Sequence, residues 1–157
     1  AHVGAQMLGA MVGATLVWLH YLPHWARTGD AELIRACYCN TPAVRSTGSN
    51  LVAEIIGTAV LVIVAGAIGA KGVLGASPAT NLGSFLVGCL VWGIGLSLGG
   101  PTGYAINPAR DLGPRIAHAI LPIANKGGSD WGYSWIPVVG PMIGAGLAAL
   151  LWGAIRS

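Results

Sequence analysis

The chain alternates between long apolar runs and shorter polar connections. Four runs approach about 20 residues, the length that an α-helix needs to cross the roughly 30 Å hydrocarbon core of a bilayer. They cover residues 3–22, 51–70, 82–98 and 135–155. This pattern predicts an all-α membrane protein with four transmembrane helices.

Composition agrees with a membrane environment. Hydrophobic residues make up 54% of the chain and charged residues only 8%, and the mean hydropathy is +0.69, well above the usual range of a soluble domain. The net charge of +3 is spread along the connections without a basic run, so nothing indicates a nucleic-acid partner. We expect membrane lipid to surround the protein.

Glycine is abundant, at 25 residues, and several glycines lie four residues apart within the apolar runs. Small residues at this spacing allow membrane helices to approach closely. The spacing predicts tight helix packing, although glycine is also simply common in membrane spans. The pairs are Gly9 with Gly13, Gly95 with Gly99, and Gly140 with Gly144.

A different pattern separates the third run from the fourth. Residues 102–134 are moderately apolar but repeatedly interrupted by glycine and proline, and the stretch is too short and too broken to cross the membrane twice. Within it, Asn107 followed by Pro108 indicates a helix start, because asparagine is favoured as the N-cap and proline at the first helical position. We predict a re-entrant loop and half-helix over about residues 101–121.

Such a helix start would direct unpaired N–H groups and a partial positive charge into the membrane interior. With its side-chain oxygen used in capping, Asn107 can turn its amide N–H outward as a donor. Arg110 is a permanent cation that is costly at membrane depth unless it lines a water-filled path, which favours a pore-lining role over a surface position. Asp111 is expected to pair with Arg115 or to stabilise the positive helix start.

An internal repeat connects the first run to the fourth. Residues 9–16 read closely against residues 140–147, as expected for equivalent elements of a duplicated unit. Three crossings separate their starts, so the two helices should run in opposite directions, the signature of an inverted-topology repeat. Two further spans and a second re-entrant loop are then expected before Ala1. Chance similarity between two Gly/Ala-rich helices is the alternative.

The stretch of residues 103–115, with Asn107-Pro108-Ala109-Arg110 at its centre, resembles the second signature loop of bacterial glycerol facilitators almost residue for residue. These proteins belong to the aquaporin or major intrinsic protein family. The resemblance extends over essentially all of the chain, with the first run matching the third of six spans. It implies a partial aquaporin-like helical bundle in the cell membrane, a homotetramer in the full-length protein, no catalysis and no cofactor.

The family pattern further implies a constriction formed by an arginine and its neighbours, onto which Gly95, Tyr104 and Arg110 fall. Glycine at the first of these positions should leave the pore wide enough for a linear polyol. Tyr104 departs from the phenylalanine that is more usual in the enteric proteins, which adds a hydroxyl group to the constriction.

Four other residues match the family pattern. Glu54 matches a carboxylate in a span that accepts hydrogen bonds from the re-entrant loop, which would offset the penalty of burying it. Asp111, Arg115 and Pro137 resemble the glycerol-conducting branch. Each is expected to support the pore.

The resemblance therefore implies passive conduction of glycerol, other small neutral solutes and water through a pore lined by the Asn-Pro-Ala-Arg loop, with no metal ion. Two alternatives stay open. One is a non-conducting fragment that needs its missing N-terminal half. The other is a small membrane metal-binding protein that uses His20, His24, Cys37 and Cys39, which carry side chains of metal-ligating types.

Overall fold

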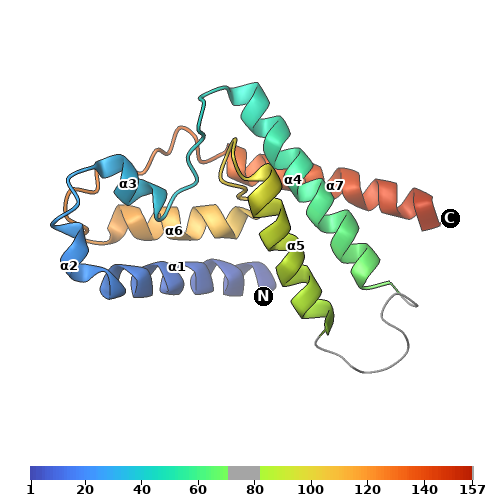
Figure 1. Cartoon of the computed structure of the whole chain (residues 1–157), viewed down its shortest axis with the longest axis horizontal. Coiled ribbons are helices and arrows are strands. Elements are labelled where there is room, and N and C mark those ends of the chain that lie inside the picture. The colour runs from blue at the N-terminus through green and yellow to red at the C-terminus, as the bar shows by residue number, and fades with distance from the viewer. Residues whose placement is uncertain (71–81, 157) are drawn as a thin grey trace.

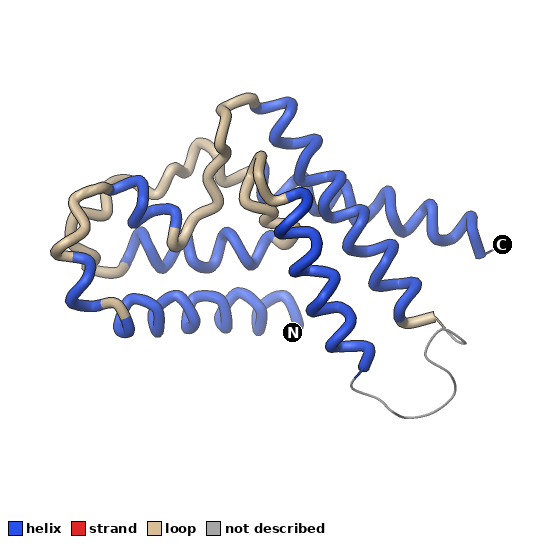
Figure 2. Tube along the Cα trace, in the orientation of Figure 1, coloured by secondary structure: helices blue, strands red, loops and turns tan. Residues whose placement is uncertain are grey.

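The computed structural model describes residues 1–70 and 82–156 (Figure 1). All the regular structure in these residues is α-helical (Figure 2), which confirms the predicted all-α class. The helices are α1 (His2–His20), α2 (Leu22–Trp25), α3 (Ala31–Ala36), α4 (Thr47–Ile68), α5 (Leu82–Leu98), α6 (Pro108–Ile120) and α7 (Ile136–Arg156).

Three of the helices, α1, α4 and α7, are long and apolar enough to cross a membrane. The predicted run over residues 82–98 forms α5 with the same bounds, but its 17 residues correspond to only about 26 Å at 1.5 Å per residue. The described part of α5 is therefore shorter than a full span, and the fourth crossing stays a prediction.

The helices form two groups that meet at the loop before α6. α1 lies alongside α6 in one group, while α4 packs against α7 and α5 in the other (Figure 1). Figure 1 also shows α1 running toward the end of the molecule that carries α2, and α7 running away from it. The two helices that share the repeat thus run in opposite directions, as the inverted repeat predicts.

Glycines bring the helix backbones together in both groups. A Cβ atom added to Gly140 would lie 2.6 Å from the Cβ of Glu54, and one added to Gly144 would lie 2.4 Å from the carbonyl oxygen of Ile55. Between α1 and α6, a Cβ atom on Gly113 would lie 2.6 Å from the Cβ of Ala10. The prediction of tight packing is confirmed for Gly140 and Gly144.

The other two glycine pairs behave differently. A Cβ atom added to Gly9 or Gly13 would meet nothing within 4 Å among the residues that the structure describes, so the face of α1 that carries them is unpacked there. Gly95 and Gly99 face the side chain of Tyr104 rather than another helix. A Cβ atom added to Gly95 would lie 2.8 Å from the Cζ of Tyr104, and one added to Gly99 would lie 2.7 Å from its Cδ1. Gly95 of α5 and Gly99, which follows the end of α5, therefore make room for a loop residue.

A small apolar core ties the first polar connection to α1 and α6. Its buried members include Trp25 of α2, Ile34 of α3 and Ala117 of α6. The indole N–H of Trp25 donates a hydrogen bond of 2.9 Å to the carbonyl oxygen of Trp18, which fixes the turn after α1. This core holds the segment between α3 and α4 against α6, where that segment reaches the candidate site.

Candidate functional site

The loop that precedes α6 has an unusual backbone. Gly103, Tyr104 and Ile106 have φ values of 76°, 42° and 43°, in the left-handed region that favours glycine. For a β-branched residue such as isoleucine this conformation is a true outlier, and each such residue costs about 1–3 kcal/mol. The surrounding structure must therefore hold this loop in place.

Glu54 of α4 supplies much of that support. Its side chain is 1% exposed, its Oε1 accepts a hydrogen bond of 3.0 Å from the N–H of Ala105, and its Oε2 accepts one of 2.8 Å from the N–H of Ile106. One turn further along α4, Gly57 leaves room for the Ile106 side chain, whose Cγ2 would lie 3.0 Å from an added Cβ. The hydrogen bonds expected between Glu54 and the loop are present.

The start of α6 follows the predicted pattern. Asn107 is the N-cap, with its Oδ1 accepting a hydrogen bond of 2.9 Å from the N–H of Ala109, and Pro108 is the first helical residue. No acceptor for the Asn107 amide N–H group lies among residues 1–70 and 82–156. The amide is therefore free to donate to a molecule beside the helix start.

A cavity of about 430 Å³ opens beside this helix start. Its polar lining comes from Gln6, Asn107 and Arg110, and the thiol-bearing Cys37 also borders it. The remaining lining is apolar and comes mainly from the face of α1 that looks toward α6: Ala10, Gly13, Ala14 and Val17, with Ala109 and Pro114 of α6. The cavity is thus mostly apolar, with a few polar groups that include the Asn107 amide and the Arg110 guanidinium.

The three predicted constriction residues lie together. The Cζ atom of Arg110 is 5.4 Å from the centre of the Tyr104 ring, within the range of a cation–π contact. The same ring covers Gly95, because a Cβ atom there would lie 2.8 Å from the Cζ of Tyr104. The Tyr104 ring occupies the space that Gly95 leaves on α5. The absence of a side chain at Gly95 therefore makes room for the ring and does not leave an open gap.

Asp111 and Arg115 form an ion pair one turn apart on α6. Arg115 donates from Nε to Oδ2 at 2.8 Å and from Nη2 to Oδ1 at 2.7 Å, and both side chains are 0% exposed. Arg115 also donates to the carbonyl oxygens of Ser129 and Asp130, at 2.6 and 2.9 Å. The pair predicted from the sequence is present, and it fastens the segment after α6 to the helix.

The far end of α6 is closed by a lysine. The Nζ of Lys126 donates hydrogen bonds to the carbonyl oxygens of His118, Ala119 and Leu121, at 2.7, 2.8 and 2.7 Å. A cation at a helix C-terminus is favourable because the carbonyl groups there carry a partial negative charge. Both ends of α6 therefore have defined partners. Pro137 is fully buried at the start of α7, and its supporting role stays a prediction.

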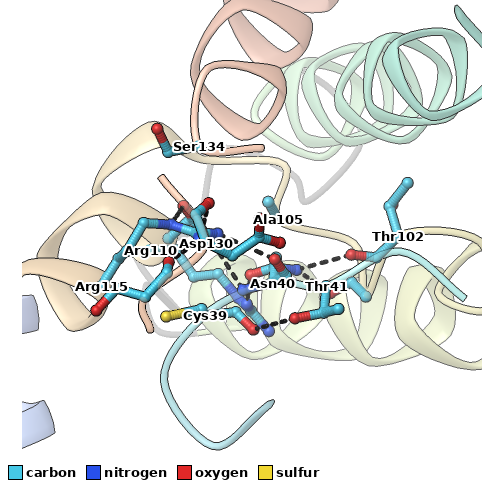
Figure 3. Close-up of polar contacts among 12 residues, drawn as sticks. Cys39, Asn40, Thr41, Thr102, Ala105, Arg110, Arg115, Asp130 and Ser134 are labelled. Atoms are coloured by element: carbon cyan, nitrogen blue, oxygen red, sulfur yellow. Dashed lines mark hydrogen bonds and ion pairs between the residues drawn. The ribbon is translucent and has the colours of Figure 1, made fainter. Parts of the chain in front are cut away.

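Sequence reasoning missed Asn40, in the segment between α3 and α4. Its side-chain oxygen accepts a hydrogen bond from the Nη1 of Arg110, and Figure 3 shows it between Thr102 and the two arginines. Its partners lie 62 to 75 residues further along the chain, and its own neighbours form no motif. No local signal in the sequence indicates this contact.

The residues of the metal alternative do not form a ligand set. Within the described ranges, no group of three or more His, Cys, Asp or Glu side chains lies close enough to hold a metal ion. Cys39 is 1% exposed, and burial raises the pKa of its thiol to about 11, despite the opposing effect of Arg115. A thiol with such a pKa is a poor metal ligand because the thiolate is the ligating form.

Sequence comparison agrees with the loop geometry. A sequence profile described as Major intrinsic protein matches residues 1–152. The chain belongs to the major intrinsic protein family. It is thus an integral membrane protein, in keeping with its three helices of spanning length.

Several curated relatives of this major intrinsic protein are described as glycerol facilitators. A probable glycerol uptake facilitator protein of Thermotoga maritima is 58% identical over 96% of this chain and 62% of its own length. A glycerol uptake facilitator protein of Streptococcus pneumoniae is 54% identical with the same coverage, 96% and 62%. A D/L-lactic acid transporter of Lactiplantibacillus plantarum is 46% identical over 92% of this chain and 60% of its own length. The chain spans less than two thirds of each of these relatives.

Proposed function

We propose that this major intrinsic protein, in its full-length form, is a passive channel for glycerol, other small neutral solutes and water. One observation carries the proposal: the free amide of Asn107 and the guanidinium of Arg110 border a cavity whose remaining lining is mostly apolar, apart from Gln6 and Cys37. Glycerol has hydroxyl groups along one edge and a hydrocarbon backbone along the other. Such a molecule can keep its hydroxyl groups hydrogen-bonded while its carbon atoms lie against the α1 face.

Conduction in this scheme exchanges solvent hydrogen bonds for bonds to the protein. The Asn107 amide donates to a hydroxyl oxygen near the start of α6, where the helix N-terminus adds a partial positive charge of about half a unit. Arg110 carries five N–H donors and a full charge at the constriction. Both features favour neutral solutes with acceptor oxygens and disfavour protons and other cations.

The constriction of Gly95, Tyr104 and Arg110 gives the scheme its size limit. The Tyr104 ring offers an apolar face on one side and Arg110 offers donors on the other, 5.4 Å from the ring centre. We propose that a linear polyol passes beside this pair, with its carbon atoms along the ring and its hydroxyl groups at the remaining Arg110 donors. We propose that the remaining pore wall comes from residues outside this chain and that the full-length protein is a homotetramer in the lipid bilayer.

Solute flux into proteoliposomes tests the proposal. Stopped-flow swelling would be followed in gradients of glycerol, lactic acid and sorbitol, for the 157-residue chain and for a chimera that adds the part of the Thermotoga maritima relative outside the 62% that this chain matches. We expect the chimera to conduct glycerol and the chain alone to conduct weakly or not at all. Equal, protein-independent swelling in the glycerol gradient would refute the channel, and flux of lactic acid alone would change its substrate.

A matched pair of variants tests the pore-lining role of Asn107. Asn107→Asp keeps an N-cap acceptor but removes the amide donor, so glycerol flux should fall on the order of tenfold, as loss of a hydrogen bond of about 1.4 kcal/mol implies. Asn125→Asp is the control, because Asn125 is exposed and its amide donates, within the described part of the chain, only to the carbonyl oxygen of Thr28, at 3.3 Å. If the two variants conduct alike, Asn107 does not face the permeant.

A further inference from the structure

We propose that Asn40 is a positioning residue for Arg110, and that it sets how strongly the channel discriminates glycerol from bulkier polyols. The inference rests on the proposed function. It concerns Asn40, in the segment between α3 and α4, to which the sequence pattern assigned no role. The first support is the contact between the Oδ1 of Asn40 and the Nη1 of Arg110, seen in Figure 3.

This contact is the main restraint on the Arg110 side chain. Arg110 is exposed, and within residues 1–70 and 82–156 its guanidinium has no carboxylate partner and no hydrogen-bond acceptor other than Asn40. The neighbouring carboxylate of Asp111 is already taken by Arg115. The Tyr104 ring offers a cation–π contact, which restricts distance more than rotation. An arginine side chain held by one oxygen depends on that oxygen for its orientation.

Asn40 is itself firmly held. It is 4% exposed, and its Nδ2 donates to the carbonyl oxygens of Thr102 at 3.1 Å and Gly103 at 2.8 Å. Its backbone N–H donates to the Oδ1 of Asp111 at 2.7 Å, and its carbonyl oxygen accepts from the Nη2 of Arg115 at 3.0 Å. The backbone and the amide are therefore both fastened to the site.

These partners also decide which way the amide faces. In the opposite orientation, the side-chain oxygen would face the two carbonyl oxygens of Thr102 and Gly103, and the NH₂ group would face the guanidinium. Both arrangements place like groups together, acceptor against acceptor and donor against donor. The oxygen must therefore point at Arg110, and the loop before α6 sets the direction in which Arg110 is held.

The neutral amide suits this role better than a carboxylate. An aspartate or glutamate beside Arg110 would neutralise its charge and occupy two of its donors in a bidentate pair. The amide oxygen accepts one hydrogen bond and leaves the charge and the other donors for the permeant. Asn40 thereby fixes the shape of the constriction without removing its positive potential.

The test measures selectivity as well as flux. In the conducting chimera, Asn40→Ala should lower the ratio of glycerol to xylitol permeability on the order of tenfold, because the freed guanidinium swings away from the constriction and loses an orienting bond to a charged group. Asn50→Ala is the matched control. Asn50 is also 4% exposed, but its Nδ2 donates only to the carbonyl oxygen of Val44, at 3.1 Å, so the ratio should stay within about twofold.

A double-variant cycle separates positioning from general support of the fold. When Arg110→Ala is already present, adding Asn40→Ala should leave the ratio unchanged, because there is no guanidinium left to orient. A residue that only stabilises the fold would lower all fluxes together in either background. If Asn40→Ala does not reach the membrane, Asn40→Ser removes the same acceptor with a smaller loss of polarity and carries the same expectation.

The outcomes distinguish the two proposals. No glycerol flux in the parent chimera overturns the proposed channel and this inference with it. If the parent chimera conducts glycerol but Asn40→Ala leaves the ratio of glycerol to xylitol permeability unchanged, the inference alone is overturned. Where Asn40→Ala does not fold, an unchanged ratio in Asn40→Ser has the same meaning. An equal fall of the ratio in the presence and absence of Arg110 also overturns it.

Discussion

Replacement of Glu54 by glutamine tests how the re-entrant loop is held. The substitution keeps the size of the side chain but exchanges one acceptor oxygen for an NH₂ group. Glu54 accepts from two backbone N–H groups, at 3.0 and 2.8 Å, so in the variant one of these donors faces another donor. The charge that strengthens the remaining hydrogen bond is lost as well.

The expected loss of stability follows from these contacts. A hydrogen bond to a charged group contributes about 1.5–3 kcal/mol, and a buried N–H group left without a partner costs about 1–3 kcal/mol. We expect Glu54→Gln to destabilise the fold by about 2.5–6 kcal/mol in total, a large part of the roughly 5–15 kcal/mol that stabilises a typical protein. The left-handed conformations of Tyr104 and Ile106 would then relax.

Thermal unfolding of purified protein in detergent measures this loss. At about 2–4 °C per kcal/mol for a chain of this size, the midpoint Tm should fall by about 5–24 °C. Thr58→Val is the matched control, because Thr58 is buried one turn away on α4 and donates only to the carbonyl oxygen of Glu54 within the helix, at 2.8 Å. A Tm for Glu54→Gln within about 2 °C of this control would refute the claim that the carboxylate holds the loop.

Three further predictions concern packing, charge and thiol chemistry. Gly144→Ala should lower Tm, because the added Cβ would lie 2.4 Å from a backbone oxygen of α4. Gly13→Ala should be neutral or stabilising in the 157-residue chain, because an added Cβ there meets nothing within 4 Å in the described residues. Equal Tm shifts for the two variants would contradict the packing. Asp111→Asn should lower the free energy of unfolding by about 3–5 kcal/mol, because it leaves the buried guanidinium of Arg115 without a counter-charge. Disruption of the exposed ion pair within α3 should cost under about 1 kcal/mol. Denaturant unfolding compares the two changes. Maleimide at pH 7.5 should label the exposed Cys37 but should not label Cys39 until the protein unfolds, because burial raises the pKa of the Cys39 thiol to about 11. Mass spectrometry of the labelled peptides identifies the modified cysteine. Labelling of Cys39 in the folded protein would contradict its burial.

The sequence was most informative where a local rule determines the structure. Asn107 and Pro108 are favoured at the two positions that begin a helix, and α6 begins there. The apolar runs predicted the positions of α1, α4, α5 and α7 to within a few residues, because hydrophobic length alone indicates a membrane helix. The pairing of Asp111 with Arg115 also follows from a local spacing of one helical turn.

Contacts between distant segments could not be predicted in the same way. The side chain of Asn40 meets Arg110 across 70 residues, and only the folded chain brings them together. Likewise, the glycines of α1 and α7 have the same spacing, but Gly144 packs against α4 while Gly13 meets no partner in the described residues. Identical spacing predicts a surface that can pack closely, and the presence of a neighbouring helix decides whether it does.

The lysine cap on α6 has an electrical consequence. α6 has 13 residues, about 20 Å at 1.5 Å per residue, so it is too short to cross the bilayer core. The ammonium group of Lys126 compensates the negative terminus. At the opposite terminus the carboxylate of Asp111 lies in the first turn, but its charge is shared with Arg115 in a buried ion pair. The positive charge that the cavity meets at this end of the helix therefore comes chiefly from Arg110, which borders the cavity and has no carboxylate partner among residues 1–70 and 82–156.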